Sequence, residues 1–364
     1  MARELRFDRA LLAVALAMLA LGLVSIYSAS GVLALTRKGD PNYFLVRQSI
    51  FVGLGLVALL AVLQVDLAFL KRPRVVWGLV AIQLLSLLAT LAMPAINGSH
   101  RWLRVGGFRV GQPSEMAKLT LVLLAAYLLE KRERENRSWA QLGVPLGGVA
   151  GLAALLILLQ PDLGTVVVLA AVLGTLLIAA GLPGKWIAAA AVLGALALAV
   201  LMFSSAYRRE RMTAFFDPEH DPQGSGFQAR QSLIAVGSGG LTGKWLEGGS
   251  QKLMFLPEPH TDFLFAMVGE ELGLPGTFGV LALFLGFGAL GLRAVRGAPD
   301  PFAAYLALGI TSWIVLQGLV HILVCLTLLP NKGLPLPLMS YGPSAMAVAL
   351  TGVGLLLNVS QYRP

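Results

Sequence analysis

The chain has few charged residues and a single cysteine, and both shortages restrict the class of protein. Of its 364 residues, 13% are charged and 57% are hydrophobic, which leaves too little polar surface to cover a soluble core of this size. Cys325 lies inside an apolar stretch and has no second cysteine to pair with, so an internal disulfide and a paired-thiol metal site are excluded. The composition therefore predicts an integral membrane protein.

The sequence also lacks the apolar–polar alternation of a transmembrane β-barrel, whereas long apolar runs recur along it. Because lipid offers no partners for open backbone groups, these runs should form helices. We expect an all-α integral membrane protein, a bundle of about ten transmembrane helices in a single polytopic domain over residues 1–364. The first run is too long for an ordinary cleaved signal and is interpreted as the first helix. The runs lie near 10–30, 44–65, 74–94, 113–130, 142–159, 163–181, 185–203, 276–294, 302–327 and 342–360.

The formal net charge is +9, but the basic residues stand in short clusters between the apolar runs. That distribution is typical of topology signals and argues against a nucleic-acid partner. Both termini should therefore be cytoplasmic, and residues 204–261, between the seventh and eighth spans, should form one long extracellular loop. The clusters on the cytoplasmic side are Arg3, Arg6, Arg9, Lys71, Arg72, Arg74, Lys131, Arg132, Arg134, Arg137, Lys185, Arg293, Arg296 and Arg363.

The segment FLPEPHTDFLFA at 255–266 places Asp262 where a polar stretch gives way to a hydrophobic one. A carboxylate in that position is unfavourable unless it is used, so Asp262 is the leading candidate for a functional site. The break LGLPG at 272–276 predicts a short helix, with Thr261 or Asp262 as its N-cap, before the true span begins. His260 either orients Asp262, binds a cation beside Glu258, or is an ordinary loop histidine.

Two further segments carry polar residues at the outer ends of predicted helices. GQPSEMAKL at 111–119 opens a helix near Pro113 and puts Glu115 and Lys118 on one face, three residues apart. They can neutralise each other as an ion pair, line a polar cavity, or do both. In QPDLGT at 160–165, Asp162 is favoured as the cap of the next helix.

Basic residues on the outer side run against the topology rule, so some of them should meet an anionic ligand such as a diphosphate headgroup. The alternative is a solvated loop surface. The glycines of Ser238–Lys244 permit tight turns near an oxygen-rich ligand, although the spacing is not that of a P-loop. Prolines stiffen the segment at 330–344, which carries Lys332 and Ser340. The outer basic residues are Arg101, Arg104, Arg109, Arg208, Arg209, Arg211, Arg230, Lys244 and Lys252.

Several of these segments together resemble a known family. They are GQPSEMAKL, QPDLGT, QARQSLIAVGSGGLTGKW, FLPEPHTDFLFAMVGEELG and PNKGLPLPLMSYGPS, in this order along nearly the whole chain. The resemblance is to the SEDS proteins of shape, elongation, division and sporulation, and the short termini favour their RodA branch over FtsW. It implies a peptidoglycan glycosyltransferase that polymerises lipid II at the outer face of the bacterial cytoplasmic membrane, for cell-wall elongation and cell shape.

The resemblance also implies roles for individual residues. It makes Asp262 the essential aspartate, and it places the family's charged pair at Glu115 and Lys118 and a further aspartate at Asp162. Asp262 is then the general base that takes the proton of the attacking sugar hydroxyl, and the reaction inverts the anomeric configuration. The leaving diphosphate is to be stabilised by a divalent cation such as Mg²⁺ or Mn²⁺, or by Lys118, Arg101, Arg109 and Arg230.

The implied substrates are lipid II and undecaprenyl-diphosphate-linked glycan, and the implied partner is a class B penicillin-binding protein, a transpeptidase. Membrane lipids surround the spans. Two other functions stay open at this point: a lipid II flippase or transporter, and a non-catalytic scaffold for the transpeptidase. The eight glycines between 224 and 249 predict a backbone in the long loop that bends easily and that a partner orders.

Overall fold

The computed structural model describes residues 7–95, 99–106, 108–203, 209, 215, 225–245, 256, 258–330 and 333–362. Helices dominate this part of the chain, and a two-stranded antiparallel hairpin, β1 (Leu103–Val105) and β2 (Phe108–Gly111), precedes α5. The helices are α1 (Arg9–Lys38), α2 (Tyr43–Leu63), α3 (Leu67–Leu70), α4 (Pro73–Leu91), α5 (Pro113–Glu135), α6 (Trp139–Leu159), α7 (Leu163–Ala179), α8 (Gly184–Phe203), α10 (Ser225–Gly239), α12 (Leu264–Arg296), α13 (Pro301–Cys325) and α14 (Pro343–Ser360).

The predicted all-α membrane fold is confirmed, and each of the ten apolar runs coincides with a helix or part of one. Seven helices of the described residues are long and apolar enough to cross a membrane: α1, α2, α4, α6, α12, α13 and α14. Helix α7 and the stretch Gly184–Ala197 of α8 are apolar but shorter. Helix α5 carries Glu115 and Lys118 within its apolar run. The chain is therefore a multi-pass membrane protein, and ten spans remain a prediction.

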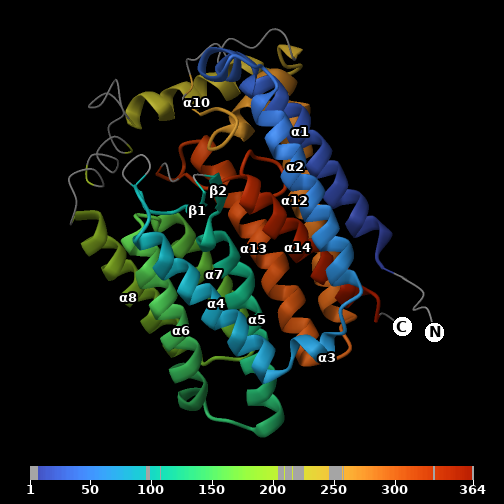
Figure 1. Ribbon diagram of the computed structural model, residues 1–364, viewed down its shortest axis with the longest axis vertical. Helices are drawn as coiled ribbons and strands as arrows, with labels where there is room; N and C mark the ends of the chain where they lie inside the picture. The colour runs from blue at the N-terminus through green and yellow to red at the C-terminus, as the bar shows by residue number, and fades with distance from the viewer. Residues whose placement is uncertain are drawn as a thin grey trace.

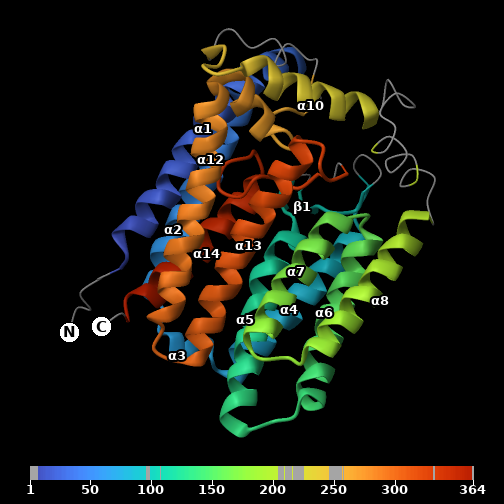
Figure 2. The same cartoon turned by 180° about the vertical axis from the view of Figure 1, so that it is seen from behind.

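Helix α13 lies at the centre of the bundle (Figures 1 and 2). It packs against α12 and α14 on one side and against α5 and α7 on the other. Most of its side chains are buried, including the large ring of Trp313. A polar group on α13 therefore faces protein, which makes this helix a suitable carrier for an internal site.

The two chain ends lie at the end of the bundle away from α10 (Figure 1). The backbone N–H of Asp8, the N-cap of α1, donates to Ser360 Oγ at 3.0 Å, and Arg293 donates to the Asp8 carboxylate. Lys71 pairs there with Glu130 at 3.0 Å and with Asp300. The predicted basic clusters around Lys71 and Arg293 thus share one end of the molecule, as the topology rule requires.

Part of the predicted long loop is helical. Helix α10 lies across the end of the bundle opposite α3 and packs against α12 (Figures 1 and 2). A methyl group added at Gly239 would lie 1.9 Å from the Gly269 carbonyl oxygen. At Gly243, whose φ is +76°, it would lie 2.2 Å from the Glu271 carbonyl oxygen. These two glycines permit close backbone contact, a role that the sequence did not indicate, and the flexibility expected of the long loop stays a prediction.

The predicted break in the segment after Asp262 is confirmed, because Gly273 interrupts α12 with φ +62° and ψ −151°. The predicted N-cap was wrong. Helix α12 begins at Leu264, and its N-cap is Phe263, which makes no side-chain capping bond. Thr261 and Asp262 instead belong to a turn in which both backbone N–H groups donate to the Glu258 carbonyl, at 3.2 and 3.4 Å.

Candidate active site

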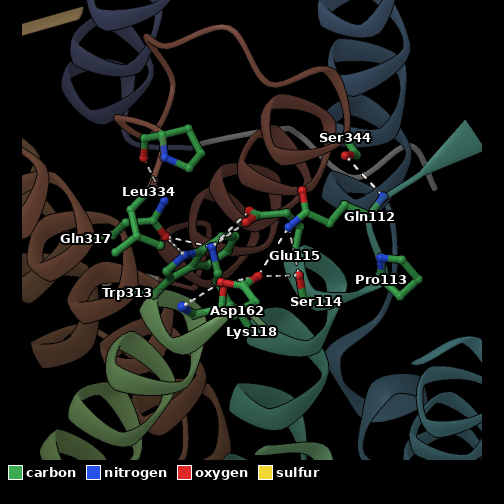
Figure 3. Close-up of polar contacts among 12 residues, drawn as sticks. Gln112, Pro113, Ser114, Glu115, Lys118, Asp162, Trp313, Gln317, Leu334 and Ser344 are labelled. Atoms are coloured by element: carbon green, nitrogen blue, oxygen red, sulfur yellow. Dashed lines mark hydrogen bonds and ion pairs between the residues drawn. The ribbon is translucent and has the colours of Figure 1, made fainter. Parts of the chain in front are cut away.

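The first part of the site is the buried ion pair at the start of α5 (Figure 3). Lys118 Nζ donates to Glu115 Oε1 and Oε2 at 2.8 and 2.9 Å, and both side chains are almost completely buried. Pro113 occupies the first turn, where its missing N–H is not needed, and Glu115 lies favourably in that same turn near the positive helix end. The predicted mutual ion pair is therefore confirmed.

Residues of α13 complete the environment of Lys118. Its ammonium also donates to Gln317 Oε1 at 2.8 Å and lies 5.6 Å from the centre of the Trp313 ring. A narrow pocket adjoins this group, and Glu115 is one of its lining residues. A polar lining for a ligand stays a prediction. The pocket is lined by Glu115, Trp313, Gln317, Pro335, Leu336, Pro337, Leu338, Ser340, Ala345, Met346 and Ala349.

Asp162 caps α7, as predicted. Its carboxylate accepts from the backbone N–H of Thr165 at 3.2 Å and from the Thr165 hydroxyl at 2.9 Å. It also accepts from Ser114 Oγ at 3.1 Å and from Gln112 Nε2 at 3.3 Å (Figure 3). Asp162 is buried and joins the start of α7 to the start of α5, so it holds the Glu115 helix in place rather than facing an open site.

Asp262 lies at the end of the bundle that carries α10, in the turn before α12, and it is partly exposed. Gly333 is its neighbour from a distant part of the chain. A methyl group added at Gly333 would lie 3.0 Å from Asp262 Oδ2. Cys325 Sγ lies 3.7 Å from the backbone oxygen of Asp262, so the end of α13 supports the same turn.

The segment 333–342 lies between Asp262 and the Glu115–Lys118 pair. The N–H of Tyr341 donates to the His260 carbonyl at 2.9 Å, which ties the segment to the Asp262 turn. Gln48 of α2 donates to the Ser340 carbonyl and accepts from Gly342 N–H, both at 3.3 Å. Ser340 itself is buried, and its hydroxyl accepts from Leu336 N–H at 3.0 Å. Ser340 therefore shapes this segment, and its hydroxyl is engaged within it.

His260 is buried between aromatic rings, with ring centres 4.4 Å from Phe44 and 5.1 Å from Tyr341. Burial lowers the pKa of His260 to about 4, so the ring is neutral at pH 7. Its Nε2 lies 3.8 Å from Glu258, which pairs with Arg37 at 2.7 Å. His260 thus shapes the turn through packing. Within the described ranges, no three His, Cys, Asp or Glu side chains are grouped as ligands for a metal ion.

The predicted outer cations have different settings. Arg101 donates to the Gln160 carbonyl at 3.1 Å and to that of Pro161, so it supports the turn before α7. Arg230 is exposed on α10. Arg109 lies in β2, but its side chain is outside the part of the chain that the structure describes. Lys332 is outside that part altogether. The structure therefore brings Asp262, Glu115 and Lys118 to one region through segment 333–342, and it places Arg101 and Asp162 in a supporting turn.

Sequence reasoning missed the polar residues of α13. Gln317 and His321 are buried, four residues apart, and both bond to backbone carbonyls of segment 333–342. The signal was present, since two polar side chains at helical spacing inside an apolar run seldom face lipid.

Comparison with known proteins identifies the family of this chain. A family model described as cell cycle protein, covering FtsW, RodA and SpoVE, matches residues 8–364. The chain belongs to this family, and the expected SEDS resemblance is confirmed. One relative, a probable peptidoglycan glycosyltransferase FtsW of Nitrosococcus halophilus, is 43% identical over 97% of this chain and 92% of its own length.

Two solved structures share the fold. A structure described as the structural coordination of polymerization and crosslinking by a peptidoglycan synthase complex has a TM-score of 0.79, with 30% identity and 98% coverage of both chains. The rod shape determining protein RodA of Thermus thermophilus has a TM-score of 0.73, with 28% identity over 99% of this chain and 98% of that one. The FtsW relative is more similar in sequence to this chain than the RodA structure is, so the comparisons do not support the expected preference for the RodA branch.

Proposed function

We propose that this chain is a peptidoglycan glycosyltransferase that polymerises lipid II at the outer face of the bacterial cytoplasmic membrane. The observation that carries the proposal is the setting of Asp262. It is a partly exposed carboxylate at the end of the bundle away from the chain termini. It lies next to Gly333, the first residue of the segment 333–342 that contacts the Lys118 environment. The family to which the chain belongs, and the name of its relative, support the same activity.

In this proposal Asp262 acts as the general base. The 4-hydroxyl of the acceptor sugar attacks the anomeric carbon of a diphosphate-linked donor, and Asp262 takes the hydroxyl proton as the glycosidic bond forms. The bond to the diphosphate breaks on the opposite face, so the anomeric configuration inverts. Negative charge grows on the leaving diphosphate and requires cationic groups nearby.

Several basic residues are candidates for stabilising the leaving diphosphate. Lys118 is enclosed by Glu115 and Gln317. The Glu115 carboxylate neutralises its positive charge, so Lys118 does not act on the diphosphate as an isolated cation. Arg230 on α10 is the exposed candidate, with Arg109 and Lys332 as predicted candidates beyond the described side chains. A divalent cation enters the proposal only as a counter-ion carried by the diphosphate, and a chelator titration with Mg²⁺ and Mn²⁺ add-back tests it.

The proposal includes an orientation and a partner. Both termini face the cytoplasm, because the end that holds them carries the basic clusters, and Asp262 then faces the exterior. A class B penicillin-binding protein supplies the crosslinking activity. The synthase complex among the similar solved structures supports such an assembly.

The test is polymerisation of lipid II by the purified chain, with and without the partner. Asp262→Asn keeps the size of the side chain and removes the base, so product should be lost while the thermal transition stays unchanged. Glu258→Gln, a second carboxylate of the same turn paired at the surface with Arg37, is the matched control and should keep full activity. Full polymerisation by Asp262→Ala would exclude the catalytic assignment, and lipid II movement across vesicles without product would favour a flippase.

A further inference from the structure

Three polar side chains follow one face of α13 at four-residue intervals: Gln317, His321 and Cys325. All three are buried. In a helix long and apolar enough to cross a membrane, each buried polar group needs a partner, and the partners reveal what the face supports.

The partners of Gln317 and His321 are neighbouring carbonyls of the segment that follows the helix. Gln317 Nε2 donates to the Pro335 carbonyl at 2.8 Å, while Gln317 Oε1 accepts from Lys118 and Trp313 (Figure 3). His321 Nδ1 lies 2.7 Å from the Leu334 carbonyl oxygen. A carbonyl only accepts, so His321 carries its proton on Nδ1.

These two bonds fix the backbone directly beside Asp262. Residue 333 precedes Leu334, and its Cα lies beside the Asp262 carboxylate, because a methyl group added there would lie 3.0 Å from Oδ2. At its far end the α13 face reaches the same turn, through Cys325 Sγ and the Asp262 carbonyl. One helix face therefore connects the Lys118 environment with the Asp262 turn.

We propose that His321 and Gln317 are positioning residues, which set the backbone at Gly333 and through it the place of the Asp262 carboxylate. The proposal rests on the function proposed above. Glycosyl transfer depends strongly on geometry, because a base displaced by about 1 Å can lose as much as a hundredfold in rate. The two residues touch backbone carbonyls, and their effect on the reaction passes through Gly333.

A purely stabilising role is the competing explanation, since most buried polar groups are hydrogen-bonded in any protein. Ser312, on the same helix, is an example of a purely stabilising hydrogen bond. Its buried hydroxyl donates to the Gly309 carbonyl at 3.0 Å, within α13. His321 and Gln317 reach out of the helix to successive residues of one segment, which is the arrangement expected of a support for that segment.

The experiment compares His321→Asn with His321→Leu in the full-length protein together with its transpeptidase partner. The amide nitrogen of asparagine is attached at the same carbon as Nδ1 of histidine, so it can donate to the Leu334 carbonyl, whereas leucine cannot. We expect His321→Leu to lower kcat for lipid II polymerisation by about tenfold or more with KM little changed. His321→Asn should stay within about threefold of the wild type, and so should the control Ser312→Ala.

Hydrogen exchange of residues 333–342 and 258–266 supplies a measurement that needs no activity. Exchange should rise in His321→Leu and not in His321→Asn or Ser312→Ala. If His321→Leu does not fold, Gln317→Glu replaces it, because it keeps an oxygen for Lys118 and removes the donor to Pro335.

Each outcome decides the proposal. Unchanged kcat or unchanged exchange in the variant that lacks the donor would overturn it, and so would equal losses in His321→Asn and His321→Leu. If the wild type with its partner makes no glycan while the exchange differences appear as expected, the proposed function fails and the support of Gly333 stands.

Discussion

Among single residues, Glu115 and Lys118 show how the interior of the helix bundle tolerates charge. Each is almost fully buried, and the ammonium donates to both carboxylate oxygens of its partner. In a medium of low dielectric constant, removing one partner leaves an uncompensated charge. This typically lowers the free energy of unfolding by about 3–5 kcal/mol. The pair is therefore a unit whose members cannot be judged separately.

We predict that Glu115→Ala and Lys118→Ala each destabilise the protein and impair polymerisation, and that the double variant loses less than the sum of the two. The physical reason is that the double variant leaves neither charge unpaired. Thermal stability in detergent and lipid II polymerisation, read as a double-mutant cycle, measure the coupling. Strictly additive losses would contradict it and would indicate separate contacts with a ligand.

The burial of His260 leads to a second prediction, which concerns the dependence of stability on pH. Its pKa is lowered from 6.5 to about 4 by burial, with Glu258 opposing and Arg37 adding to the shift. The unfolded chain binds a proton below pH 6.5 and the folded chain only below about pH 4. The neutral His260 ring therefore makes its full contribution to the free energy of unfolding above pH 6.5. This contribution is lost as the pH falls from 6.5 to about 4, and the total loss is about 3 kcal/mol.

The variant His260→Phe tests this, because a phenyl ring can stack on Phe44 and Tyr341 without titrating. Its midpoint temperature should fall less between pH 7 and pH 4.5 than that of the wild type, where this range is an approximate window set by the two pKa values. An identical acid profile in both proteins would assign the acid sensitivity to other groups.

Among the elements, the docking of α10 on α12 depends on glycine. Gly239 and Gly237 both lie in α10, but only Gly239 approaches another backbone, that of Gly269. No described atom lies within 4 Å of a methyl group added at Gly237. The two positions thus separate close packing from the general effect of glycine in a helix.

We predict that Gly239→Ala displaces α10 and lowers both stability and activity, since the clash is with backbone and cannot be relieved by a side chain. Gly237→Ala, the matched control, should be neutral or stabilise α10 by about 0.5–1 kcal/mol. Hydrogen exchange of residues 225–245 reports the docking directly. Equal protection in both variants would show that the Gly239 contact is not required.

Element by element, long apolar runs could be predicted well and α10 could not. A run such as that of α13 has one stable solution in lipid, which is a helix. Helix α10 mixes polar residues with glycine, and its helical state depends on packing against α12, which a local pattern does not contain. The N-cap of α12 was missed for a similar reason, because the turn closed by Glu258 precedes it.

The site residues could be predicted from the sequence where a single short segment held a charged residue in an apolar context. Asp262, Asp162 and the Glu115–Lys118 spacing each stand out locally, because charge in an apolar context is rare. The contact between Gly333 and Asp262 joins segments 71 residues apart in the sequence, and no local pattern contains it. The role of His321 likewise appears only when its partner carbonyl is known.

For the whole molecule, helix α10 is joined to the part of α12 that follows Asp262. Lys244 follows α10 and pairs with the fully buried Glu270 at 3.4 Å, and its backbone N–H donates to the Glu270 carbonyl at 3.0 Å. Leu274 N–H donates to the Gly240 carbonyl at 3.1 Å, just beyond the break at Gly273. The part of α12 between Asp262 and that break is therefore held on the end of α10.

We predict that the transpeptidase partner activates the chain by favouring one placement of α10 and the start of α12. A partner shifts such an equilibrium only by its differential affinity for the two placements, so activation requires contact with this region or with helices that touch it. Exchange of residues 225–245 and 264–273 should slow on partner binding, while that of α6, which does not pack closely against α10, should not change. Gly239→Ala should reduce the activated rate more than the rate of the chain alone, because it weakens the contact through which the partner acts. A large gain in activity with unchanged protection in both ranges would refute this route.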